Sequence, residues 1–400
     1  MDGRAPRRAG APPRPEREDP RTAAALRRSS ELAVHDEEDE DDDEEMPRIQ
    51  VTRRALLLGF TFVVLAIVFL VVVLPQIAGL GDTWKQVRDG DPLWLLVAGV
   101  FTALSFGGYV MLFQGVYVRD GFRLSVVESY QITMAGLAAT RVFAAGGAGG
   151  IALTAWALRR AGLPRRAVAD QTLAFLVLTY GVYMAAIVIG GFGLWFGLFP
   201  GSDDWAITLL PAIVGLVAFA LALLAALTPT DLQERLEGYA HRHGRLARFA
   251  QRAANLPAAI SAGIRLSVQH VRSGDPALAG SVLYWGFNIA VLWASFKAFG
   301  EAPPWAVVVM GYFVGMLANL LPLPGGVGGV DGGMIGAFVA FGGESRDSIV
   351  VAVLTYRLFA FYLPTIPGAV AYLQLRRTVA RWSEERAARR AALGRAEAPA

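Results

Sequence analysis

Three charged side chains lie well inside otherwise apolar stretches of this 400-residue chain, away from the ends of those stretches: Arg141, Arg357 and Asp331. A charge at membrane depth is costly and usually serves a function. A guanidinium group matches phosphate oxygens with paired donors, so both arginines are candidate ligands for a lipid phosphate. Asp331 is a candidate for orienting Arg357 or a headgroup amine, or it is a structural partner. For Arg141, the sequence leaves open a structural salt bridge with Glu128.

Two tyrosines in apolar stretches carry a weaker signal. Tyr180 and Tyr356 each close the tripeptide Leu-Thr-Tyr. Each phenol is a candidate for hydrogen bonding to a headgroup, or it satisfies a neighbouring backbone group.

Two glycine clusters, at residues 146–150 and 325–329, interrupt long apolar stretches. Backbone N–H groups without side chains around them can approach phosphate oxygens closely. The clusters therefore predict phosphate-binding loops, and close packing of helices through small residues is the alternative. The candidate glycines are Gly146, Gly147, Gly149, Gly150, Gly325, Gly326, Gly328 and Gly329.

The composition argues against most enzyme chemistry. The chain has no cysteine, and its four histidines all lie in polar stretches. Thiolate nucleophiles and Cys-ligated metals are thereby excluded, and a histidine base within the membrane is not expected. No nucleotide-binding motif is present. We expect no catalytic residue, no metal, no cofactor and no enzymatic activity.

The elements that position these residues are expected to be membrane helices. Hydrophobic residues make up 54% of the chain, compared with roughly 45–50% in soluble proteins. The first apolar run, Ala55 to Ala78, exceeds the ~30 Å hydrocarbon core at ~1.5 Å per residue. The sequence predicts six transmembrane helices, at about residues 55–78, 93–116, 171–199, 207–227, 278–299 and 349–373.

Two further apolar stretches, about residues 124–157 and 304–341, each contain a glycine cluster and are predicted to be re-entrant hairpins. Lysine and arginine near short loops mark the cytoplasmic side. The basic loop Arg159 to Arg166 then lies inside, so the first stretch must enter and leave on the cytoplasmic side. When the later membrane crossings are counted from that loop, the second hairpin opens to the outside.

The two broken stretches resemble each other in sequence. GLAATRVFAAGGAGG begins at Gly136 and GMLANLLPLPGGVGG at Gly315, and a Leu-Thr-Tyr tripeptide follows each. This order indicates an internal duplication. Because the hairpins open to opposite sides, the predicted fold class is an all-α integral membrane bundle with an inverted repeat. In transporters, inverted repeats form a substrate-binding site near the midplane of the bilayer.

The polar segments divide the chain. Residues 1–46, basic and then acidic, are predicted to form a disordered cytoplasmic tail. Residues 47–375 form the transmembrane domain, with an amphipathic cytoplasmic insertion at 230–275. Residues 376–400 form a charged cytoplasmic tail. We expect a multi-pass protein of the inner (plasma) membrane with both termini in the cytoplasm.

The run Pro322 to Gly328 followed by Asp331, together with Arg141 and its glycine cluster, resembles a flippase-like membrane family that includes the transmembrane region of lysylphosphatidylglycerol synthases. The likeness covers about residues 50–375. The family usually has glutamate where this chain has Asp331, and a proline or charged residue where this chain has alanines around the first cluster. The resemblance implies translocation of a phospholipid or polyprenyl-phosphate-linked lipid. Lysyl transfer would need a large cytosolic domain, and about 25 residues follow the last predicted span.

These patterns predict a protein that binds or translocates an anionic lipid between leaflets, with membrane lipids as partners and no nucleic acid. Two alternatives stay open. One is an intramembrane lipid-modifying transferase with Asp331 or Glu128 as base. The other is a non-catalytic scaffold for a cell-envelope enzyme, bound through the charged tails.

Overall fold

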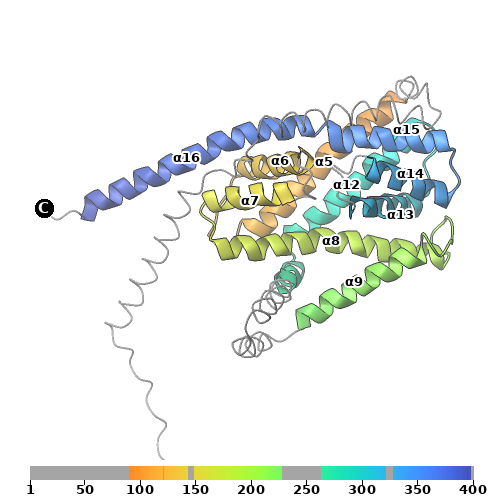
Figure 1. Cartoon of the computed structure of the whole chain (residues 1–400), viewed down its shortest axis with the longest axis horizontal. Coiled ribbons are helices and arrows are strands. Elements are labelled where there is room, and N and C mark those ends of the chain that lie inside the picture. The colour runs from red at the N-terminus through yellow and green to blue at the C-terminus, as the bar shows by residue number, and fades with distance from the viewer. Residues whose placement is uncertain (1–89, 120, 143–147, 228–262, 321–327, 398–400) are drawn as a thin grey trace, which may run out of the picture. The chain divides into compact units, whose positions relative to one another are not determined.

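The computed structural model describes residues 90–119, 121–142, 148–227, 263–320 and 328–397, and every regular element within these ranges is helical (Figure 1). The predicted first span, residues 55–78, the acidic tail and most of the 230–275 insertion lie outside the described residues. The first half contains α5 (Pro92–Tyr117), α6 (Val126–Val142), α7 (Ala148–Arg160), α8 (Arg165–Trp195) and α9 (Leu209–Leu227).

After a helix at residues 263–272, the second half repeats this order of long and short helices. It contains α12 (Pro276–Ala298), α13 (Trp305–Met316), the 3-10 turn η2 (Leu317–Leu320), α14 (Gly329–Phe341), α15 (Arg346–Arg357), the π-helical segment η4 (Leu358–Tyr362) and α16 (Thr365–Glu397).

Within the described residues, four helical segments are long and apolar enough to cross a membrane. They are α5, α8, α12 and the segment Arg346–Ala388, which contains α15, η4 and most of α16. Four of the predicted spans fall on them. The fifth falls on α9, whose apolar stretch Leu209–Leu224 is shorter. The predicted total of six spans is therefore matched in part.

The helices α5 and α12 begin alike. Each begins at the proline of a Gly-Asp-Pro tripeptide, and the side chain of Asp91 or Asp275 accepts the N–H two residues later, at 2.8 and 3.1 Å. This is N-capping, with proline at the first helical position, where a missing N–H costs nothing. The shared Gly-Asp-Pro tripeptide extends the sequence repeat N-terminally.

These two matching helices run antiparallel. The Asp91 N–H donates to the carbonyl of Ala298 at 2.8 Å, so α5 begins where α12 ends. Midway, Gly108 faces Gly280 so closely that a Cβ on Gly108 would lie 2.7 Å from the Tyr284 backbone nitrogen. Small residues allow such close approach of two helices.

The first broken stretch forms a pair of packed helices, α6 and α7 (Figure 1). They cross at Gly136 and Gly150, where a Cβ on Gly150 would overlap the side chain of Thr140 and the carbonyl of Gly136. Gly136 also faces Thr154, so the two helices run antiparallel.

The second broken stretch has the same form. The helices α13 and α14 are antiparallel, with Gly311 against Phe338 and Gly315 against Gly333 and Met334. Gly315 corresponds to Gly136 in the sequence repeat. Gly136 faces Thr154, which corresponds to Gly333 at the same offset, so the two hairpins cross at matching positions.

The predicted last span is interrupted. The helix changes to π geometry over Leu358–Tyr362 and turns before α16 begins at Thr365. Pro364 has no N–H to donate to the carbonyl four residues earlier, and Pro367 has none either, so the regular ladder cannot continue. A single continuous helix over 349–373 was therefore wrong in detail.

Polar bonds tie α8 to the second half of the chain. Carbonyls of the first Leu-Thr-Tyr tripeptide accept from α12: Ser281 Oγ donates to Leu178 at 3.0 Å and Trp285 Nε1 to Thr179 at 2.8 Å. Tyr183 donates to the carbonyl of Phe313 at 2.7 Å. Buried aromatic and aliphatic side chains of α8, α12, α13, α14 and α15 pack around these bonds.

Candidate functional site

A buried ion pair joins the second hairpin to the helix that follows it. Arg357 Nε lies 2.6 Å from Asp331 Oδ1, and the two residues are 5% and 1% exposed. Removing one partner of such a pair would leave a buried charge uncompensated. The structure thus places Asp331 where it orients Arg357, one of the roles expected for it.

Asp331 also holds the start of α14. Its second carboxylate oxygen accepts the N–H of Gly328 at 2.8 Å, and Gly328 adopts a φ of +81°, which favours glycine. An acidic residue in the first helical turn also complements the positive end of the helix dipole. One carboxylate therefore fixes both the hairpin turn and the arginine.

Arg141, near the end of α6, reaches across to the interrupted helix. Its guanidinium donates to the carbonyls of Ala360 at 3.0 Å and Phe361 at 2.9 Å, and to Thr365 Oγ1 at 3.3 Å. In a regular helix, residue 364 would donate its N–H to the carbonyl of Ala360, but Pro364 has no N–H. Arg141 thereby supplies a hydrogen bond that the helix break removes.

Both arginines lie against one aromatic ring. The Cζ atom of Arg357 is 4.3 Å and that of Arg141 is 5.0 Å from the centroid of Phe361. Arg141 is also 6.0 Å from the ring centroid of Phe106. Cation–π contact favours a guanidinium in surroundings that hold little water. The cluster of Arg141, Arg357, Asp331 and Phe361, called here the arginine cluster, is thus assembled from α6, α14, α15 and η4.

Of the two candidate tyrosines, one lies next to the arginine cluster. Tyr356 is buried, and its hydroxyl donates to that of Tyr312 at 3.2 Å. Tyr180 is 54% exposed and makes a ring contact with Tyr183. The two Leu-Thr-Tyr tripeptides therefore place their tyrosines in different surroundings.

The candidate glycines are distributed over three settings. Gly149 and Gly150 lie within α7, where Gly150 packs on the Gly136 carbonyl. Gly328 caps α14 and Gly329 is its first residue. Gly146, Gly147, Gly325 and Gly326 lie outside the described residues. Contact of these glycines with phosphate remains a prediction.

The salt bridge considered between Arg141 and Glu128 is wrong. Glu128 Oε1 instead accepts from Arg381 at 3.2 Å and from Trp382 Nε1 at 3.1 Å. The reason is the length of α16, which continues as a helix well beyond Arg376 and packs along α6.

A second polar cluster joins the end of α5 to the start of α12. Arg119 donates to Asp275 Oδ2 at 2.9 Å and lies 2.7 Å from Nδ1 of the fully buried His270. The same Nδ1 lies 3.2 Å from Asp275 Oδ2, so the three side chains form one contact network. Within the described residues, no group of three or more His, Cys, Asp or Glu has the arrangement of a metal site.

Sequence reasoning missed Phe361 and Pro364. Phe361 carried no signal, because one phenylalanine among many in an apolar run looks like any other. Pro364 and Pro367 did carry a signal, since two prolines inside a predicted span indicate a break whose freed carbonyls need new donors. Arg141 is such a donor.

A comparison with protein families matches residues 56–368 to the family described as lysylphosphatidylglycerol synthase TM region. The chain belongs to this family. The match includes the arginine cluster and both hairpins, and it confirms the resemblance seen in the sequence. Membership in this lysylphosphatidylglycerol synthase TM-region family makes the chain a membrane protein and points to a lipid-related role.

Relatives of known sequence agree with this family. A UPF0104 membrane protein of Methanothermobacter thermautotrophicus (strain Delta H) is 24% identical over 331 residues, which are 78% of this chain and 94% of that protein. A further match to a UPF0104 membrane protein of the same organism is 34% identical over 88 residues, 22% of this chain and 25% of that protein.

Proposed function

We propose that this protein binds the phosphate of an anionic lipid at the arginine cluster and moves the lipid between the two leaflets. The lipid is a phospholipid or a polyprenyl-phosphate-linked lipid. The proposal assigns no catalytic residue and no cofactor, and it takes membrane lipids as the partners.

The observation that carries the proposal is an excess of positive charge within the fold. Arg357 is paired with Asp331, whereas the hydrogen bonds found for Arg141 within the described residues all go to uncharged oxygens. Among the described residues, Arg141 thus has no carboxylate partner. A phosphate supplies the missing negative charge with strong, charge-assisted hydrogen bonds.

Arg141 keeps donors for such a ligand. A guanidinium carries five N–H groups, and the bonds to Ala360, Phe361 and Thr365 use three of them. Because these bonds end on η4 and the start of α16, a phosphate drawn to Arg141 acts directly on the interrupted helix. We propose that the site opens alternately toward the cytoplasm and toward the outside around this point.

The antiparallel course of α5 and α12 supports the inverted repeat on which this mechanism rests. In the proposed topology, both hairpins are re-entrant, Asp203 lies outside, and Glu384 lies in the cytoplasm of an inner-membrane protein. The chain has no cysteine, so single cysteines test this. In intact cells, an impermeant maleimide should modify Asp203→Cys and spare Glu384→Cys, and the reverse pattern would refute the topology.

The proposed function is tested by reconstituting the purified chain into liposomes that contain fluorescent phosphatidylglycerol. Dithionite then quenches the outer leaflet, and the rate of continued quenching reports movement. Arg141→Ala and Arg357→Ala should each lower this rate roughly tenfold or more, since a charge-assisted hydrogen bond contributes about 1.5–3 kcal/mol.

Arg377→Ala is the matched control, because Arg377 is an exposed arginine of α16 outside the arginine cluster. Its rate should equal that of the wild type. Unchanged movement in both cluster variants, or no movement of any anionic lipid by the wild type, would refute the proposal. Release of a modified lipid product would favour the transferase alternative.

A further inference from the structure

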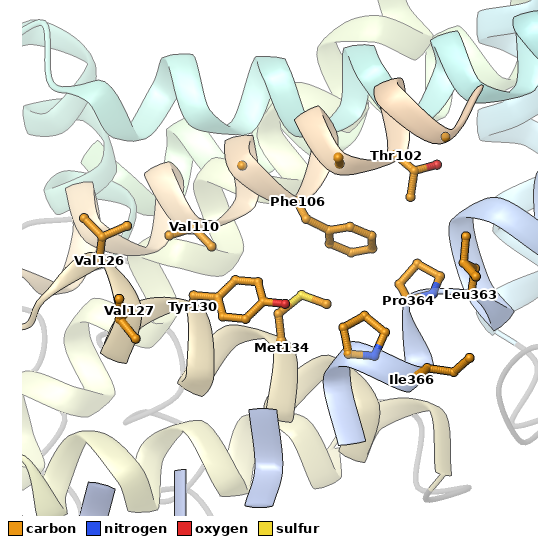
Figure 2. A pocket seen from close by; sticks show the side chains of 14 residues that line it. Thr102, Phe106, Val110, Val126, Val127, Tyr130, Met134, Leu363, Pro364 and Ile366 are labelled. Atoms are coloured by element: carbon orange, nitrogen blue, oxygen red, sulfur yellow. The ribbon is translucent and has the colours of Figure 1, made fainter. Parts of the chain in front are cut away.

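A groove of about 750 Å³ runs between α5, the first half of α6 and the start of α16 (Figure 2). Side chains from all three helices point into it, among them Phe106, Val110, Tyr130, Met134 and Pro364. It is distinct from the arginine cluster but shares residues with that cluster's surroundings.

The groove suits hydrocarbon. Its walls are mostly aliphatic and aromatic carbon, and the hydroxyl of Thr102, one of its few polar groups, already donates to the carbonyl of Ala98 at 2.8 Å. A polar ligand would lose its hydration here without gaining partners. An alkyl chain has no polar group to leave unpaired here, and it can pack against these apolar walls.

The groove adjoins the arginine cluster at Phe106. Phe106 lines the groove, and its ring faces the Arg141 guanidinium. Pro364 also lines the groove, four residues after the Ala360 carbonyl that Arg141 binds. A phosphate at Arg141 would therefore place its attached chains at the end of this groove.

The length of the groove fits an acyl chain within one leaflet. Along α5 it extends from Gly99 to Val110, which is ~17 Å at 1.5 Å per residue and close to half of the ~30 Å hydrocarbon thickness.

We infer that this groove holds one acyl chain of the phospholipid whose phosphate is bound at Arg141. This inference rests on the proposed function and names the substrate as a phospholipid. The groove fixes the lipid by its tail while the arginine cluster binds its head.

The chain offers a clean way to fill the groove. Gly107 lines it, and a Cβ at this position would meet nothing within 4 Å. Gly107→Trp should therefore fold and occupy the groove. Gly286→Trp is the matched control, because Gly286 is also an exposed helical glycine with nothing within 4 Å, on α12.

The experiment uses phosphatidylglycerol with a photoreactive diazirine in one acyl chain, reconstituted with the full chain, illuminated and mapped by peptide mass spectrometry. We expect labelling at Val110, Tyr130 or Met134, lost in Gly107→Trp and kept in Gly286→Trp. Labelling of the exposed Leu221 and Leu223 of α9 reports lipid that merely surrounds the protein, and it should be equal in all three proteins.

Labelling reports binding and not movement, so a failure of translocation leaves this test intact. Groove labelling no stronger than that of α9, or unchanged by Gly107→Trp, would overturn the inference. So would labelling of Ala55–Ala78 in place of the groove, which would show that the chain's own apolar segment covers it. Displacement by polyprenyl phosphate but not by unlabelled phosphatidylglycerol would also overturn it.

Discussion

Arg141 occupies the hydrogen-bonding place that Pro364 leaves empty. In a regular helix, the N–H of residue 364 would donate to the carbonyl of Ala360, and here the Arg141 guanidinium donates to it at 3.0 Å. An arginine on the first hairpin thus completes a helix some 220 residues later in the chain. Any ligand that competes for Arg141 also loosens this helix.

This relationship predicts a rescue. Arg141→Ala should lower the free energy of unfolding by about 1.5–3 kcal/mol, as expected for hydrogen bonds made by a charged group. Adding Pro364→Ala restores a backbone N–H that can serve Ala360, so the double variant should recover part of the loss. Thermal unfolding in detergent measures both. Equal melting temperatures for the single and double variants would show that Arg141 does not stabilise the break.

The buried pair of Asp331 and Arg357 predicts non-additive substitutions. Asp331→Asn keeps an oxygen for the Gly328 N–H but leaves Arg357 without its counter-charge, at a cost of about 3–5 kcal/mol. Arg357→Met leaves the carboxylate buried. The double variant should lose clearly less stability than the two single losses combined, because it leaves no lone buried charge. Additive losses in thermal unfolding would contradict the pairing.

The helix crossings in the two hairpins predict matched effects at glycines. Gly150→Ala and Gly333→Ala would drive a methyl group into the opposing backbone and should each cost about 1–3 kcal/mol. Gly336→Ala is the control, since a Cβ there meets nothing within 4 Å, and it should be neutral or slightly stabilising. If Gly150→Ala melts like the control, the glycine serves some purpose other than packing.

Glu128 predicts a dependence of stability on pH. Partial burial raises the pKa of this carboxyl, but hydrogen bonds from Ser125 and Trp382 and the charge of Arg381 outweigh burial and hold the pKa below its usual range. A lowered pKa in the folded state adds stability above the unfolded-state value of about 4.3, and this stability is lost as the pH falls through the folded-state pKa.

The melting temperature of the wild type should therefore fall more steeply than that of Glu128→Gln as the pH falls below about 4.3. At neutral pH, the difference should be under about 1 kcal/mol, because Arg381 is largely exposed. Parallel pH profiles for the two proteins would show that the Glu128 contacts with α16 do not persist in solution.

The sequence predicted much of the site because charges at membrane depth are rare. Arg141, Arg357 and Asp331 stood out by residue type alone, and the structure brings both arginines to one ring and pairs Arg357 with Asp331. Their partners were harder to predict. A guanidinium can donate hydrogen bonds to a carboxylate, a phosphate or a free carbonyl. Only the fold shows that Arg141 contacts the helix break at Pro364, whereas Glu128 contacts α16.

The fold was predictable where periodicity or length is decisive. The spans at 93–116, 171–199 and 278–299 match α5, α8 and α12. The glycine clusters lie at breaks between paired helices, and re-entry of these pairs into the membrane stays a prediction. The last span was less predictable, because an apolar run of sufficient length hides the effect of two prolines. The crossing of the second hairpin depends on Gly333 and Met334, which the sequence repeat did not single out.

The most direct measurement of lipid-phosphate binding uses the double variant Arg141→Ala/Pro364→Ala in the fluorescent phosphatidylglycerol assay. This variant restores the helix while removing the guanidinium, so it separates folding from binding. The account predicts a stably folded protein whose rate of lipid movement is reduced roughly tenfold or more, like that of Arg141→Ala. Movement at the wild-type rate would contradict the account and show that Arg141 serves the helix break alone.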